Sequence, residues 1–180
     1  MAKKLYENLV KPVTFREGPK GLYPNPIIWM EGKDMEGFEA NIAYTFIKEP
    51  CTMHPVKNAT VHPYDELLVF GGLDPKDIFY LGGEVSIELG EEREEYIFAE
   101  PTVICIPKGT PHGPVKIRRV SKPFAHYSCG LSPEYKATEV ILKEKGEASY
   151  GTKYAHMVKK IMTHIDAEID ASGMGYRAVT

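Results

Sequence analysis

Long apolar runs, paired cysteines and an excess of one charge are all missing from this sequence of 180 residues. Apolar runs such as residues 103–106 are far shorter than the about 18 residues that a membrane-spanning helix needs. The formal net charge of −3 does not support a nucleic-acid surface, which would need a clustered basic patch. The sequence therefore predicts neither a membrane nor a nucleic-acid partner.

Cysteine is also scarce, and its spacing bears on the cellular compartment. Cys51, Cys105 and Cys129 are an odd number without CxxC spacing, which favours reduced thiols over a disulfide framework. The first residues are followed by polar side chains and not by an apolar signal core. We therefore expect a cytoplasmic protein.

Turn-forming residues are abundant instead. Glycine (16) and proline (14) together make up a sixth of the chain, above the usual level of about 12%. Val85, Ile87 and Leu89 alternate with polar residues, as in a half-buried strand. Short apolar segments that end at turn residues recur at 27–30, 38–47, 67–70, 78–81, 85–89, 96–99, 102–106, 115–120 and 124–129. This pattern predicts an all-β sandwich or barrel.

The chain is expected to divide into three parts. Residues 1–25 are predicted to form an arm, residues 26–135 a β-barrel domain, and residues 136–180 a C-terminal extension. Within the extension we predict an amphipathic helix at about 152–172, because apolar residues recur at steps of three or four. These residues are Tyr154, Val158, Ile161, Ile165 and Ile169.

Two short segments carry the most chemical information. One is the run from His62 to Glu66 through Pro63, and the other is the run 107–112, which ends at His112. Metal donors lie about 2.1 Å from their ion, whereas four residues of straight strand span about 13 Å. His62 and Glu66 can therefore share an ion only if Pro63 begins a tight turn. His112 would come from a distant part of the chain.

These segments resemble the two motifs of the cupin family. His62-x-x-x-Glu66 is similar to the latter part of H-x-H-x3-E, and Pro107-x-Gly109-x-x-His112 is similar to P-x-G-x-x-H. The resemblance covers about residues 40–130. It implies a double-stranded β-helix, which is a jelly-roll barrel, with His62, Glu66 and His112 as metal ligands. The sequence departs from the first motif at Thr60, where the family has a histidine.

A set of two histidines and one carboxylate suits a divalent ion with open coordination positions. The donors would accept Fe, Mn, Zn, Ni or Co, and the sequence does not choose among them. His126 or His54 would be the source of a fourth ligand, although a structural or exposed role is the simpler interpretation of each.

The resemblance predicts a metal-dependent enzyme that acts on a small oxygenated or carboxylated molecule. Oxygenase, isomerase, lyase and decarboxylase chemistry remain open. Tyr64 and Glu84 are the candidates for a catalytic role, against the simpler interpretations of a packed turn aromatic and a solvated carboxylate. The alternatives are a non-catalytic cupin that binds or senses a small ligand, and a metal-free structural barrel, which Thr60 suggests. A homodimer is expected, through edge strands, the N-terminal arm and the C-terminal helix.

Overall fold

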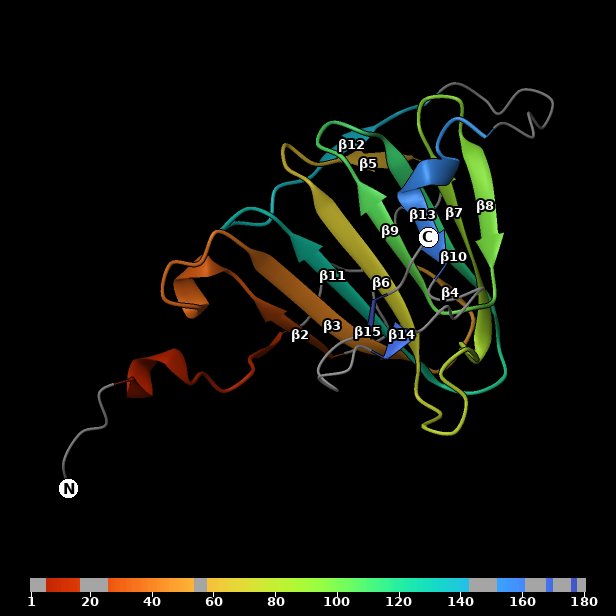
Figure 1. Ribbon diagram of the computed structural model, residues 1–180. Coiled ribbons are helices and arrows are strands. Elements are labelled where there is room, and N and C mark those ends of the chain that lie inside the picture. The colour runs from red at the N-terminus through yellow and green to blue at the C-terminus, as the bar shows by residue number, and fades with distance from the viewer. Residues whose placement is uncertain are drawn as a thin grey trace.

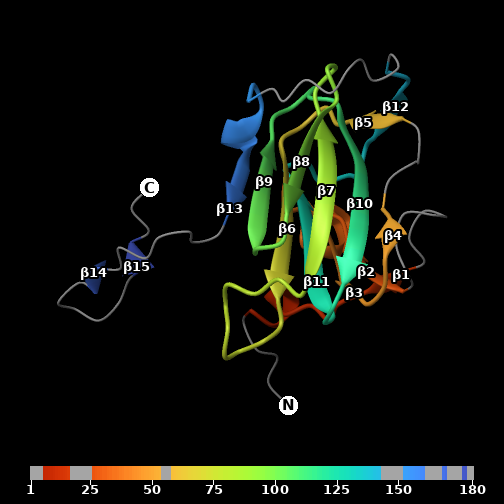
Figure 2. The ribbon, with the colours of Figure 1, turned by 90° about the vertical axis from the view of Figure 1, so that its right-hand side faces the viewer.

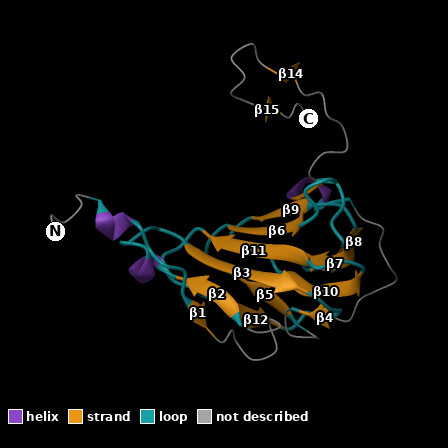
Figure 3. Cartoon of the chain, turned by 90° about the horizontal axis from the view of Figure 1, so that it is seen from below, coloured by secondary structure: helices purple, strands orange, loops and turns teal. Residues whose placement is uncertain are grey.

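Two antiparallel sheets face each other and form the body of the molecule, as Figure 3 shows from below. The computed structural model describes residues 6–16, 26–53, 58–142, 152–160, 168–169 and 176–177. Short 3-10 helices lie outside the sheets, and they are η1 (Glu7–Leu9), η2 (Gly32–Asp34) and η3 (Ala155–Met157). The all-β jelly-roll prediction is confirmed.

The first sheet faces the viewer in Figure 1. Its strand order is β1 (Phe15–Arg16), β2 (Ile27–Met30), β3 (Asn41–Ile47), β11 (Phe124–Gly130), β6 (Glu66–Gly72), β9 (Thr102–Ile106) and β13 (Val158–Lys160). Strands β3 and β11 are neighbours although about 80 residues separate them, so the chain closes the sheet through long-range pairing.

The second sheet is seen in Figure 2. Its order is β12 (Thr138–Val140), β5 (Ala59–Val61), β10 (His112–Val120), β7 (Gly83–Leu89) and β8 (Glu94–Phe98), and β4 (Cys51–Thr52) also pairs with β10. A separate pair consists of β14 (Glu168–Ile169) and β15 (Tyr176–Arg177). Between β5 and β11 the chain passes repeatedly from one sheet to the other, which brings distant strand ends together.

The core lies between the two sheets. Val85, Ile87 and Leu89 on β7 are fully buried, as their alternation predicts. From the first sheet, Phe70 on β6 and Phe124 on β11 pack into the same cluster. The inward positions near one end are polar instead of apolar, and they include His62, Glu66 and His112. A core with a buried polar end is where a binding site is expected.

The strand predicted at 78–81 is wrong. These residues belong to the turns between β6 and β7, where Ile78 is 61% exposed while Leu81 is buried in the core. The turns are held locally, because the Asp77 side chain accepts a hydrogen bond from the Phe79 N–H. A local hydrogen bond of this kind competes with strand pairing.

The helix predicted at about 152–172 is not found. Residues 155–157 form η3, and residues 158–160 form β13, which pairs with β9 at the edge of the first sheet. Met157 lies in the core and Tyr154 packs against it from this short 3-10 turn and strand, so the burial of these apolar residues does not require a helix. Residues 161–167 and 170–172 lie outside the described part of the chain. In the described part, no helix is long and apolar enough to cross a membrane.

Candidate metal centre

Three side chains from separate elements meet at one end of the barrel. His62 follows β5, Glu66 is the first residue of β6, and His112 is the first residue of β10. The predicted bend at 63–65 and turn at 107–111 are both present, and they are tied together by two hydrogen bonds. Gly109 N–H donates to the His62 carbonyl at 3.0 Å, and Lys108 N–H donates to Asp65 Oδ1 at 2.7 Å.

The donor atoms converge on one point. Oε2 of Glu66 lies 3.5 Å from Nε2 of His62 and 3.3 Å from Nε2 of His112, and all three atoms lie within 4.8 Å of one another. The three residues are 2%, 5% and 0% exposed for His62, Glu66 and His112. The structure thus brings together the residues that the motifs single out.

Hydrogen bonds to backbone carbonyls orient both imidazoles. Nδ1 of His62 lies 2.6 Å from the Lys136 carbonyl, and Nδ1 of His112 lies 3.1 Å from the Thr110 carbonyl. A carbonyl can only accept, so each Nδ1 carries the proton and each Nε2 keeps its lone pair. Burial is the main cause that lowers the pKa of His62, although Glu66 opposes this effect. The His62 ring is therefore neutral at pH 7, as a metal ligand must be.

The arrangement fits a divalent ion. Two donors that each lie about 2.1 Å from a tetrahedral ion are about 3.4 Å apart, which matches the observed 3.3 and 3.5 Å. Nε2 of His62 is buried and makes no hydrogen bond to any described residue. The second-sphere carbonyls also follow the usual pattern of metal-binding histidines. The cluster therefore supports a divalent metal, without fixing which one.

Tyr64 packs against the His62 ring and contacts the backbone of Lys136. Its ring stacks on His62 with centroids 5.1 Å apart and an angle of 19°, and its hydroxyl accepts a hydrogen bond from Lys136 N–H at 3.1 Å. Burial raises the pKa of this hydroxyl, so it stays protonated. The backbone at Gly130 allows this packing, because a Cβ there would lie 2.6 Å from the Tyr64 ring. These contacts indicate a positioning role.

Replacement of Tyr64 by phenylalanine is expected to weaken the site without removing it. The hydroxyl holds the residue whose carbonyl orients His62, so its loss should lower metal affinity by about tenfold. The free energy of unfolding should fall by about 1 kcal/mol. Calorimetric metal titration and urea unfolding would measure the two effects, with Tyr80→Phe as the control. An unchanged affinity would show that Lys136 is held by other contacts.

Of the two proposed fourth ligands, the described residues include only His126, and it is not part of the cluster. His126 points inward on β11, but its partner in the ladder is Phe70, four residues along β6 from Glu66, or about 13 Å. It stacks on the Phe70 ring with centroids 4.4 Å apart, and its Nδ1 lies 3.1 Å from the Val69 carbonyl. His126 is thus a packed interior residue, and His54 lies outside the described residues.

Thr60 and Glu84 also take definite positions. Thr60 is buried and lies directly opposite His112 in the β5–β10 ladder. A histidine at position 60, where the cupin motif has one, would therefore lie beside His112. Glu84 instead forms an ion pair with Arg118, with 3.5 Å between Oε1 and Nε, on the outer surface of the second sheet. The structure therefore does not bring Glu84 to the cluster.

Two residues near the site, Lys136 and Tyr135, give no motif signal in the sequence. Lys136 acts through its carbonyl, which any residue type would provide, so its side chain gives no signal. Tyr135 lies edge-on to His62 with centroids 5.4 Å apart, and it also contacts Trp29. Tyr135 is the last residue of the predicted barrel domain, and Lys136 is the next residue. No motif covers this part of the sequence.

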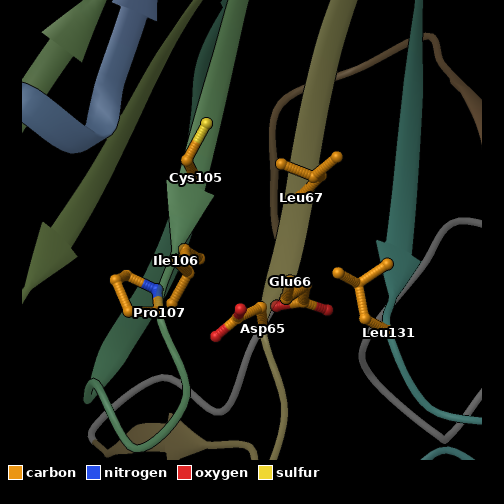
Figure 4. Close-up of a pocket in the computed structure, with 7 residues that line it drawn as sticks. All are labelled: Asp65, Glu66, Leu67, Cys105, Ile106, Pro107 and Leu131. Atoms are coloured by element: carbon orange, nitrogen blue, oxygen red, sulfur yellow. The ribbon is translucent and has the colours of Figure 1, made fainter.

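Two pockets adjoin the cluster. A surface pocket of about 670 Å³ leads to His62, and it is lined by Val61, His62, Pro63, Lys108, Gly109, Tyr135, Lys136, Ala137 and Thr138. A smaller pocket of about 260 Å³ lies on the side of Glu66 (Figure 4), and its lining is Asp65, Glu66, Leu67, Cys105, Ile106, Pro107 and Leu131.

Comparison with known proteins identifies the fold. Peruvianin-I, a cysteine peptidase from Thevetia peruviana latex, is 11% identical, with a TM-score of 0.52 over 78% of this chain and 82% of its own. Oxalate decarboxylase from Bacillus subtilis, a cupin, is 12% identical, with a TM-score of 0.45 over 72% of this chain. The chain spans only 30% of that enzyme's length. No family model and no curated protein matches the sequence.

At such low identity the similarity concerns the fold alone. The two packed antiparallel sheets are seen in the structure itself, and the likeness to peruvianin-I shows that this arrangement of strands occurs in another solved structure. The all-β architecture of antiparallel sheets is the one that the motif resemblance implies.

Proposed function

We propose that this protein is a metal-binding cupin in which His62, Glu66 and His112 hold one divalent ion. One observation carries the proposal: Oε2 of Glu66 lies close to Nε2 of both histidines. In each histidine, Nδ1 donates its proton to a backbone carbonyl, so Nε2 keeps a lone pair that points to the cluster. Two histidines and one carboxylate leave coordination positions open. When bound, such an ion supplies Lewis acidity or activates oxygen.

We further propose that the ligand is a small oxygenated or carboxylated molecule that arrives through the pocket beside His62. Lys108 stands in the lining of this pocket, and its ammonium group would attract a carboxylate, whereas the Lys136 ammonium is paired with Glu134 at 3.0 Å. Beyond them the route to the ion is narrow, because Glu66 and His112 are almost completely buried. Turnover of this ligand would make the protein a metal-dependent enzyme, with the reaction class open.

A second candidate function is ligand binding or sensing without turnover. It is favoured by the positions of the two candidate catalytic residues. The Tyr64 hydroxyl is engaged with Lys136, and Glu84 is paired with Arg118 on the outer surface. Neither residue is in the lining of the pocket beside His62. Product formation from a panel of small carboxylates would decide for the enzyme, and binding without product would decide for the sensor.

Elemental analysis tests metal binding directly. Purified wild-type protein should contain close to one divalent ion per chain, and His112→Ala should contain only background metal, because removal of one of three ligands leaves too few donors. The matched control is His156→Ala, since His156 is exposed and lies outside the cluster. Metal-free wild-type protein that also fails to take up ions in titration would contradict the metal site and leave a metal-free barrel, either structural or ligand-binding.

A further inference from the structure

The loop between β11 and β12, residues 131–137, lines both pockets that adjoin the metal cluster. Leu131 lines the smaller pocket (Figure 4), and residues 135–137 line the larger one. The loop also supplies the Lys136 carbonyl that orients His62. The position of this β11–β12 loop therefore bears both on the proposed metal ligands and on the space in front of them.

Contacts from β3 and η2 hold the first half of the loop, which has no helix or strand of its own. The buried Asn41 side chain donates a hydrogen bond from Nδ2 to the Ser132 carbonyl at 2.9 Å. Gly32 N–H donates to the Pro133 carbonyl at 2.7 Å. A Cβ at Gly32 would lie 2.7 Å from the Cβ of Pro133, so the absence of a side chain there allows the close approach.

Two side chains hold the second half of the loop. Oε1 of Glu31 accepts a hydrogen bond from the Tyr135 N–H at 3.2 Å, and the Tyr64 hydroxyl accepts one from the Lys136 N–H at 3.1 Å. These two N–H groups come directly before the carbonyl that lies 2.6 Å from Nδ1 of His62. The direction of this carbonyl therefore depends on both side chains.

Glu31 is itself held in place by two cations. Its Oε2 lies 2.6 Å from Nζ of Lys33 and 3.7 Å from Nη1 of Arg16. Asp34 Oδ2 accepts a hydrogen bond from Arg16 Nη2 at 2.7 Å and another from the Glu31 N–H at 3.0 Å. The hydrogen bond from Lys33 is the main cause that lowers the pKa of Glu31, so the carboxylate is charged at pH 7. One of its oxygens thus faces the cations while the other faces the loop.

We propose that Glu31 is a positioning residue of the metal site, which acts on His62 through the β11–β12 loop. By holding the Tyr135 N–H, it fixes the neighbouring Lys136 carbonyl. That carbonyl keeps the proton on Nδ1 of His62, so Nε2 stays directed at the ion. Glu31 lies outside the segment of about 40–130 that resembles the cupin family, so the resemblance does not assign this role. The inference rests on the proposed function, because it concerns the same site.

Zinc affinity is the first test. Titration of the full chain with Zn²⁺ against a chromophoric chelator should show about tenfold weaker binding in Glu31→Ala, as is usual when an outer hydrogen-bonding partner is lost. Glu31→Gln keeps an oxygen that can accept from the Tyr135 N–H, so its binding should be weaker by only about threefold. The matched control is Glu36→Ala, since Glu36 is an exposed carboxylate that pairs with Lys11 of the N-terminal arm. It should bind zinc as wild type does.

The His62 ring gives a second readout, which needs no bound ion. In metal-free protein, ¹⁵N NMR of this ring should show a protonated Nδ1 and an unprotonated Nε2. Glu31→Ala should move both signals towards the average of two exchanging tautomers. The His112 signals should not move, because Nδ1 of His112 faces the Thr110 carbonyl, which belongs to another turn. A merely structural role of Glu31 would lower the free energy of unfolding and leave the His62 signals in place.

A double variant tests whether Glu31 and Tyr64 act on the same group. Both hold N–H groups that precede one carbonyl, so their effects on zinc affinity should be coupled. The loss in Glu31→Ala combined with Tyr64→Phe should differ from the product of the two single losses by at least about twofold. A loss equal to that product would mean that the two residues act on different groups, which would contradict the inference.

Two further results would overturn it. One is a Glu31→Ala protein whose zinc affinity and His62 signals equal those of wild type. The other is an equal loss of zinc affinity in Glu36→Ala, which would indicate a general effect of the N-terminal arm. If Glu31→Ala does not fold, Glu31→Gln is compared with Glu36→Gln, and equal zinc affinities overturn the inference. Wild-type protein that binds no zinc or other divalent ion contradicts the proposed function instead, and the His62 signals of the metal-free variants then decide whether Glu31 orients the ring.

Discussion

Saturation with a divalent ion is expected to raise the free energy of unfolding by about 3 kcal/mol when the free ion is about 100-fold above its dissociation constant. The reason is that the ion binds only the folded chain. His62 and His112 are 50 residues apart in the sequence, and the bend and turn that bring them together exist only when β5, β6 and β10 are assembled. Urea unfolding with and without added metal, followed by chelation, would measure the gain and its reversal.

Two carboxylate variants make this measurement specific. Glu66→Gln keeps the shape of the side chain but removes the charge that faces both imidazoles, so the stabilisation by metal should largely disappear. Glu84→Gln removes a carboxylate that pairs with Arg118 on the outer surface, and it should leave the gain unchanged. Equal loss in both variants would mean that the ion binds at a nonspecific acidic surface.

Acid is expected to destabilise the protein through His126, a buried residue outside the metal cluster. Burial lowers the pKa of His126 to about 4, while a histidine in the unfolded chain titrates near 6.5. Between these values the unfolded chain binds a proton that the folded chain does not. Above about pH 6.5 the His126 ring is neutral in both states, so it does not lower the free energy of unfolding. As the pH falls from 6.5 towards 4, the free energy of unfolding declines by about 3 kcal/mol in total.

Replacement of His126 by phenylalanine should remove this component of the pH dependence. The aromatic shape that stacks on Phe70 is retained, but the titratable ring is lost. Urea unfolding of chelator-treated protein at several pH values would compare wild type and variant, with the exposed His156→Gln as control. Parallel pH profiles for wild type and His126→Phe would show that the acid sensitivity arises from the carboxylates.

Strand alternation and turn residues were enough to predict the fold class. The inward side chains of β7 are Val85, Ile87 and Leu89, as the period of two requires. The same logic failed at 78–81, because an apolar run between glycines has no period and the local Asp77 hydrogen bond favours turns. It also failed at residues 152–160, where Val158 lies in a strand that pairs with β9 and Tyr154 packs on the core.

The site could be predicted only in part. The motif residues His62, Glu66 and His112 are fixed in type by the chemistry of metal ligands, so the sequence identifies them. Whether a tyrosine faces the ion or packs behind a ligand depends on the direction of its side chain, which no motif encodes. In the structure the Tyr64 ring stacks on the His62 ring. The carbonyl of Lys136 left no trace in the sequence at all, since every residue has one.

The near-complete burial of the three proposed ligands has a consequence for metal identity in the cell. Because these residues are at most 5% exposed, an ion can leave only through the narrow route beside His62, or after the bend at 63–65 or the turn at 107–111 opens. Exchange would then be slow compared with folding. The metal found in the protein would reflect which ion was abundant when the chain folded, and not only which ion binds most tightly. Protein refolded with a chosen ion should keep it after transfer to a buffer that contains a competitor.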